Sequence, residues 1–203
     1  MPTDTTLEQP GDWEPLEGAP EGIEITPAKA RHGETAALRV LVAGAIAVVI
    51  VASTNKEFEL DRFFVPKEFV LHLTALVAGV LAIGAFRRVR LNWVDLCLAG
   101  FLAFSAASAY FAADRMLAAR GLAISVSGVA IYWAARSVRE SGHARPLLTG
   151  LAAAVVVGCV TCLLQAYGME TEFFSINRAP GGTFGNRNFI AHLAAFGLPI
   201  VLF

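Results

Sequence analysis

The stretch "PLLTGLAAAVVVGCVTCLLQAYGM", from Pro146 to Met169, contains no charged side chain. As an α-helix it would be about 36 Å long, which exceeds the roughly 30 Å hydrocarbon core of a bilayer. Backbone N–H and C=O groups in lipid must be paired within the segment, so a stretch of this kind forms a helix. The sequence therefore predicts a membrane-spanning helix here, and Pro146 suits its first turn.

The same apolar character recurs along most of the chain, which is 56% hydrophobic with a mean hydropathy of +0.58. Only 16% of the residues are charged, against about 25% in a typical soluble domain. We therefore predict an all-α, polytopic membrane protein with about six transmembrane helices. In the fourth of these helices, Gly121, Ser125 and Gly128 are spaced to let neighbouring helices approach closely. The other predicted helices lie at about 36–54, 68–86, 94–113, 116–135 and from near Asn188 to 203.

The first 35 residues differ from the rest because they are rich in proline, glycine and acidic residues and lack apolar periodicity. Such a segment buries too little apolar surface to order itself, and it lacks the basic start and apolar core of a signal peptide. We expect residues 1–35 to form a disordered acidic tail and 36–203 a transmembrane helical domain. The last apolar segment ends without a polar flank, so we expect the chain to be the first half of a longer protein.

The positive charges set the predicted orientation. Nine of the 16 lysines and arginines fall on the side of the tail, and the compact clusters "RRVR" and "RSVRESGHAR" adjoin helix ends there. Because cytoplasmic loops carry the excess of such residues, we place the N-terminus in the cytoplasm. Residues 55–67, the Asp114–Arg115 turn and the loop of about 170–187 then lie outside.

Several classes of function are disfavoured by composition. The net charge of −1 says nothing about nucleic acid, but no part of the sequence looks like a basic face for a phosphate backbone, so we expect no nucleic-acid partner. Cys97, Cys159 and Cys162 all lie within apolar segments, where cysteine behaves as a small apolar residue rather than as a disulfide or metal ligand. We expect no metal and no cofactor.

The polar segment "NRAPGGTFGNRNF" (177–189) interrupts this apolar chain directly before the last helix. Its glycines, Gly182 among them, allow the backbone to form a nest of N–H groups for an anion. The helix N-terminus that follows, capped by Asn186 or Asn188, also favours negative charge. Arg178 and Arg187 add guanidinium groups that match phosphate oxygens. The segment therefore indicates a phosphate site, although a glycine-rich turn with arginines reaching toward lipid headgroups would have the same composition.

Other cations lie near the same predicted outer level. Arg120 falls about one turn inside the fourth helix, where it could pair with Asp114 or face a polar cavity. Lys67 directly precedes the second helix, where with Arg62 it could extend a basic ring or act as an interfacial anchor. Each of these cations is thus compatible with anion binding and with a purely structural role.

The segment "RAPGGTFGNRNFIAHL" (178–193) resembles the G-T-F-G-N-x-N segment of the O-antigen ligase and polymerase superfamily of bacterial inner-membrane proteins. The stretch "FFVPKEFVL" (63–71) also resembles that family, as does the run of closely spaced helices before the motif. The resemblance covers about residues 63–203. In the family a proline often stands between the two asparagines, where this chain has Arg187.

The resemblance implies a multi-pass glycosyltransferase of the bacterial inner membrane. Such proteins transfer a glycan from undecaprenyl diphosphate, on the periplasmic side, to the lipid A–core, to another repeat unit or to a protein, and the sequence does not choose among these acceptors. The family's second half, which this chain lacks, carries a large periplasmic loop with further arginines and a histidine, so this chain by itself would be inactive.

The residues expected to bind the diphosphate are Arg178, Lys67, Arg120, Arg187, Gly182, Asn186 and Asn188. Transfer also needs a base for the acceptor hydroxyl, for which His192 is the only candidate; a single histidine such as His72 or His192 more often hydrogen-bonds between helices. Two other functions stay open, a transporter or flippase for an anionic or lipid-linked solute and a non-catalytic membrane scaffold. A transporter would carry charges near the midplane of the bilayer, and here they cluster at helix ends.

Overall fold

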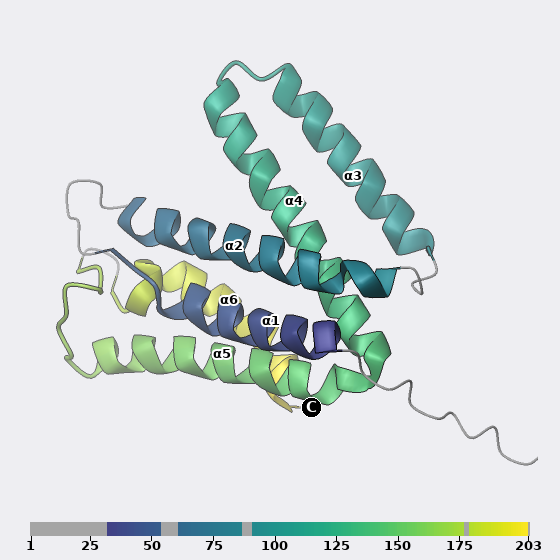
Figure 1. Cartoon of the computed structure of the whole chain (residues 1–203). Helices are drawn as coiled ribbons and strands as arrows, with labels where there is room; N and C mark the ends of the chain where they lie inside the picture. Colours follow the sequence, from purple (N-terminus) through teal and green to yellow (C-terminus); the bar gives the residue numbers. More distant parts are fainter. Residues whose placement is uncertain (1–31, 54–60, 87–90, 177–178, 203) are drawn as a thin grey trace, which may run out of the picture.

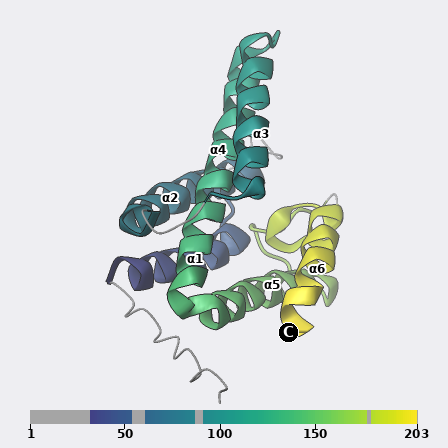
Figure 2. The same cartoon turned by 90° about the vertical axis from the view of Figure 1, so that its right-hand side faces the viewer.

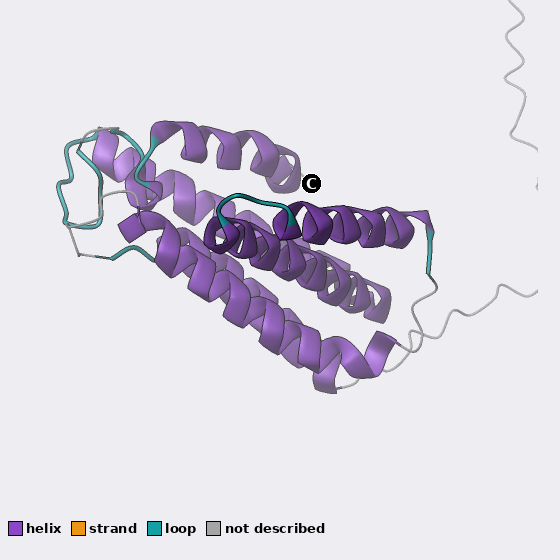
Figure 3. Ribbon diagram, turned by 90° about the horizontal axis from the view of Figure 1, so that it is seen from above, coloured by secondary structure: helices purple, strands orange, loops and turns teal. Residues whose placement is uncertain are grey.

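The computed structural model describes residues 32–53, 61–86, 91–176 and 179–202. Within these ranges all regular structure is helical, which confirms the predicted all-α class, and Figure 3 shows the helices joined by loops. The elements are α1 (His32–Ile50), α2 (Asp61–Phe86), α3 (Trp93–Tyr110), α4 (Arg115–Val138), a π-helical turn (Arg139–His143), α5 (Ala144–Ala166), a 3₁₀ turn (Gly182–Phe184) and α6 (Arg187–Leu202).

Four helical stretches of the described chain are long and apolar enough to cross a membrane. They are His32–Ile50, Arg62–Ile83, Trp93–Tyr110 and the continuous run Arg115–Ala166, which contains both α4 and α5. The remaining apolar helix, α6, is shorter than a span. Six separate spans are therefore not established.

The helices form a bundle with a projecting hairpin. Helix α1 packs between α2 and α5, α6 packs on α5, and α4 crosses both α1 and α2. Figures 1 and 2 show α3 and the first half of α4 standing out from the other helices, and α3 packs on α4 alone among the described elements. The bundle core is built largely of small side chains, which lets α1, α2 and α4 approach closely: Ala37, Leu41, Ala78, Ala82, Ala134, Val138 and Leu147.

The glycines at which helices approach one another closely are not the Gly121 and Gly128 predicted from the sequence. A Cβ at Gly44 would meet Thr74 of α2, and one at Gly150 would meet Val42 of α1. At Gly121 and Gly128, by contrast, no atom of the described residues lies within 4 Å of the added carbon. The prediction that these two glycines mediate close packing was wrong, because the face of α4 that carries them is exposed on the projecting hairpin.

Two helices begin earlier than predicted. Helix α1 begins at His32, so residues 32–35 of the predicted tail are helical, whereas residues 1–31 lie outside the described chain. Helix α2 begins at Asp61 although Pro66 lies inside it. Proline has no N–H for the carbonyl four residues earlier, that of Arg62, and the Ser53 amide donates to this carbonyl instead at 2.8 Å.

The joint between α4 and α5 is a sharp change of direction at Gly142, whose φ of 89° interrupts the helical run. Near this joint, Asp95 of α3 accepts hydrogen bonds from Arg136 (2.7 Å) and from the Trp133 indole (2.9 Å), and it also completes the N-terminal cap of its own helix with Asn92. Asp95 therefore fixes the base of the projecting hairpin to α4.

Candidate functional site

One end of the bundle brings together parts of the chain that are far apart in sequence. The last turn of α1, the first turns of α2, the end of α5 and the start of α6 meet there, at the left of Figure 1. We call this region the motif end and define it as residues 48–53, 61–67, 165–176 and 179–189. It contains most of the residues that the sequence singled out.

Lys67 is buried at the motif end, with 9% of its surface exposed. Because α2 begins at Asp61, this lysine lies in the second turn of the helix and not before it. Its ammonium donates to the carbonyl oxygens of Val48 (2.9 Å), Val49 (3.4 Å) and Val51 (2.7 Å), which lack partners within α1 because the helix ends there. All three N–H donors of Lys67 are used in this way, so a phosphate oxygen would have to displace a carbonyl.

The glycine-rich turn is folded tightly against α5. Gly182 and Gly185 adopt positive φ values of 53° and 68°, as the sequence predicted for glycines of such a turn. The amides of Gly181 and Gly182 both donate to Oε1 of Gln165 at 2.8 Å, and the Gln165 Nε2 donates to the Ser175 carbonyl. The amides expected to surround an anion are therefore bonded to a side chain of α5.

The start of α6 is capped by a residue of the motif. The Asn186 side chain accepts a hydrogen bond from the Asn188 amide at 3.0 Å, so of the two predicted capping residues Asn186 has this role. The neighbouring Thr183 is buried, and its hydroxyl donates to the carbonyl of Val49 at 2.5 Å. Asn186 and Thr183 thus join the motif to α6 and to the end of α1.

The two segments that carry the family resemblance are in direct contact. The Lys67 Nζ lies 4.7 Å from the centre of the Phe184 ring, a cation–π geometry. The Phe64 and Phe189 rings pack edge to face with centres 5.3 Å apart. Gly185 lies so close to the Phe63 ring that any Cβ would overlap it. The stretches 63–71 and 182–189 therefore form one packed unit.

Other predicted site residues lie on α4 and on the exposed side of α6. Arg120 donates from Nε to the Glu68 carboxylate at 2.6 Å and thus pairs with an acid of α2, which the sequence did not suggest. Arg187, Asn188 and His192 all lie on α6 with exposed side chains. Arg178 lies outside the described residues. His72 contacts Ser127 of α4 at 2.7 Å, which confirms the helix-to-helix hydrogen bond expected for a single histidine.

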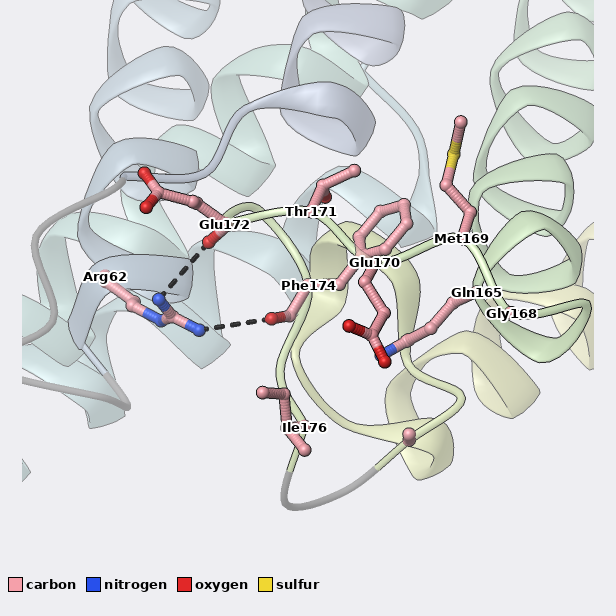
Figure 4. Close-up of a pocket in the computed structure, with 10 residues that line it drawn as sticks. Arg62, Gln165, Gly168, Met169, Glu170, Thr171, Glu172, Phe174 and Ile176 are labelled. Atoms are coloured by element: carbon pink, nitrogen blue, oxygen red, sulfur yellow. Dashed lines mark hydrogen bonds between the residues drawn. The ribbon is translucent and has the colours of Figure 1, made fainter.

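A cavity of about 610 Å³ opens beside this packed unit, and it was not anticipated from the sequence. Figure 4 shows its lining, which includes Arg62 of α2, Gln165 of α5 and the segment that follows α5. The guanidinium of Arg62 donates to the carbonyls of Glu172 and Phe174, each at 3.3 Å. Arg62 is 93% buried, and its Nε has no hydrogen-bond partner. The cavity wall thus contains a buried cation with unused donor capacity.

A smaller cavity of about 330 Å³ is lined in part by the same segment. Thr171 and Phe174 line both cavities, and the smaller one is otherwise bounded mainly by apolar residues at the end of α1. The segment 171–174 therefore contributes to the walls of both cavities.

The sequence offered one signal for this region. Gln165 is a polar residue near the end of the uncharged stretch 146–169, and such a side chain in an apolar segment generally has a specific partner. Glu170 and Glu172 gave no such signal, because acids in a loop are common. Only the fold brings them to the same cavity as Arg62.

Comparison with known proteins gives no match: no family model, no curated protein and no solved structure is significantly similar to this chain.

Proposed function

We propose that this protein is a bacterial inner-membrane glycosyltransferase, similar to the O-antigen ligases and polymerases, that moves a glycan from undecaprenyl diphosphate to an acceptor on the periplasmic side. The observation that carries the proposal is the contact between the stretches 63–71 and 182–189. These two segments resemble the family independently, and they pack through Lys67 and Phe184 and through Phe64 and Phe189. A resemblance that arose by chance would not require them to meet.

The membrane setting of the proposal is supported by the apolar helices. Large apolar side chains are exposed along their faces, among them Phe69 (67%), Phe104 (80%) and Phe196 (81%). Such exposure is costly in water and ordinary in lipid. In the proposed arrangement the protein is multi-pass with a cytoplasmic N-terminus, α6 completes a sixth span, and the motif end faces the periplasm.

The chemistry proposed for the motif end is stabilisation of a leaving diphosphate. As the acceptor oxygen bonds to the sugar carbon, the bond from that carbon to the diphosphate oxygen breaks and negative charge gathers on the leaving group. Guanidinium groups held at a dry interface stabilise that charge most in the transition state. We assign this role to Arg178 and Arg187, because Lys67 already donates to three carbonyls and Arg120 pairs with Glu68.

The remaining proposed site residues divide between scaffold and substrate. Gly182 and Asn186 shape the turn that precedes Arg187, through the Gln165 bond and the α6 cap. Asn188 and His192 are exposed on α6 and free to reach a substrate from that helix. His192 is the candidate for the base that takes the proton of the acceptor hydroxyl.

The proposal is tested by arginine variants of the full-length protein in cells that lack the chromosomal gene. We expect Arg178→Ala and Arg187→Ala each to reduce glycan transfer at least a hundredfold, which corresponds to about 2.7 kcal/mol of lost transition-state stabilisation. The readout is the glycosylated acceptor on gels, with protein amount measured in the same membranes. Arg145→Ala, on an exposed residue of α5 at the opposite end of the bundle, is the matched control and should leave transfer unchanged. Normal transfer by both motif variants would refute the proposal.

A further inference from the structure

The larger cavity at the motif end has the chemistry of a site for a hydroxyl-rich, uncharged ligand. Its volume of about 610 Å³ falls within the range of roughly 300–1,000 Å³ of small-molecule sites. Its polar wall offers donors on Arg62 and Gln165 and acceptors on Glu170 and Thr171. A sugar hydroxyl both donates and accepts, so a wall with both kinds of group suits it.

The donors of this wall are incompletely used. The Arg62 guanidinium has five N–H groups; two of the bonds it makes are long, at 3.3 Å, and its Nε has no acceptor. The Gln165 Nε2 bonds the Ser175 carbonyl with one of its two hydrogens. A buried donor without a partner destabilises a protein. A ligand oxygen that enters the cavity, with a small movement of the Glu172–Phe174 segment, would satisfy these donors.

The charged acceptor, the Glu170 carboxylate, lies on the part of the wall opposite Arg62. Figure 4 shows the Glu170 side chain directed toward Gln165, whereas the Glu172 carboxylate points away from both. The apolar part of the wall is formed by Met169, Phe174 and Ile176. An aromatic ring with flanking aliphatic groups suits the C–H face of a sugar ring, because that face is apolar while the ring edge carries the hydroxyls.

The charges of the wall select against a diphosphate in this cavity. Among the described lining residues, Arg62 contributes one positive charge, whereas Glu170 and Glu172 contribute one negative charge each. A diphosphate that entered the cavity would face two carboxylates and one guanidinium, and repulsion between like charges is unfavourable. A neutral polyhydroxyl group meets no such repulsion, and Glu170 can accept a bond from it.

We infer that the cavity lined by Arg62, Gln165, Glu170 and Thr171 binds an uncharged sugar residue and not the diphosphate. The inference rests on the proposed function in one respect, because that function identifies the sugar as part of a glycan. It assigns this sugar site to Glu170 and Arg62, which lie far apart in the sequence.

Equilibrium binding to the purified full chain in detergent micelles tests this site. The probes are glucose and N-acetylglucosamine, observed by saturation-transfer NMR, with inorganic diphosphate as the competitor. We expect both or one of the sugars to bind, and Glu170→Gln to raise its Kd about tenfold, since the variant loses a bond to a charged acceptor. Glu172→Gln is the matched control and should change the Kd less than twofold. Equimolar diphosphate should not displace the sugar.

The same measurements define the outcomes that would contradict the sugar site. Absence of sugar binding, an unchanged Kd in Glu170→Gln, or displacement by equimolar diphosphate would overturn the sugar site. Because binding is measured without transfer, the two proposals fail separately. Loss of transfer in the arginine variants together with absent sugar binding overturns the sugar site alone, whereas sugar binding together with normal transfer in those variants overturns the proposed function alone.

Discussion

Replacement of Lys67 by methionine should lower the free energy of unfolding by about 3 kcal/mol, because three carbonyls at the end of α1 lose a charged donor. The ammonium bonds Val48, Val49 and Val51 at 2.7–3.4 Å, and methionine fills similar space without any donor. Denaturant titration of the chain in detergent micelles measures the change.

The matched control for this substitution is Arg187→Met, which removes an exposed cation from α6. Exposed substitutions of this kind usually change stability by no more than about 0.5 kcal/mol. If Lys67→Met is as stable as Arg187→Met, Lys67 does not hold the end of α1, and its ammonium is available for a ligand.

Replacement of Gly182 by alanine should lower the free energy of unfolding by a similar amount, about 3 kcal/mol, for two reasons that add. Its φ of 53° is unfavourable for any residue with a Cβ. The new carbon would also lie 2.9 Å from the backbone nitrogen of Cys162, which belongs to α5 and cannot easily move. The same denaturant titration measures this effect.

Gly128→Ala provides the contrast, because no atom of the described residues lies within 4 Å of its added carbon and the residue lies inside α4. In a helix interior alanine is more favourable than glycine by about 0.5–1 kcal/mol. Gly128→Ala should therefore be as stable as the natural chain or more so. Equal stability of the Gly182 and Gly128 variants would contradict the tight seating of the turn on α5.

The sequence was sufficient to predict the helices and their approximate limits. The uncharged stretch 146–169 became α5, because backbone pairing and apolar burial both act locally along a helix. The early start of α2 could not be predicted in the same way. It depends on the Ser53 amide, which replaces the hydrogen bond that Pro66 cannot make, and this contact exists only once the chain has turned back on itself.

The candidate site was predictable in composition and not in arrangement. The glycines at 182 and 185 do adopt the positive φ values that their residue type favours. The sequence could not reveal that Gln165 would bond the amides of the turn, because that contact depends on how α5 faces it. Nor could it distinguish Lys67, whose donors are used by α1, from Arg187, which is exposed.

The most direct test of the central claim is whether a lipid-linked diphosphate binds at the motif end. A photoreactive benzoylphenylalanine would replace Asn188 on α6 or Arg145 on α5, both exposed and at opposite ends of the bundle, in membranes that contain radiolabelled undecaprenyl diphosphate. Illumination is predicted to attach the label through position 188 and not through position 145. Equal labelling from the two positions, labelling only from 145, or no labelling from either would contradict the claim.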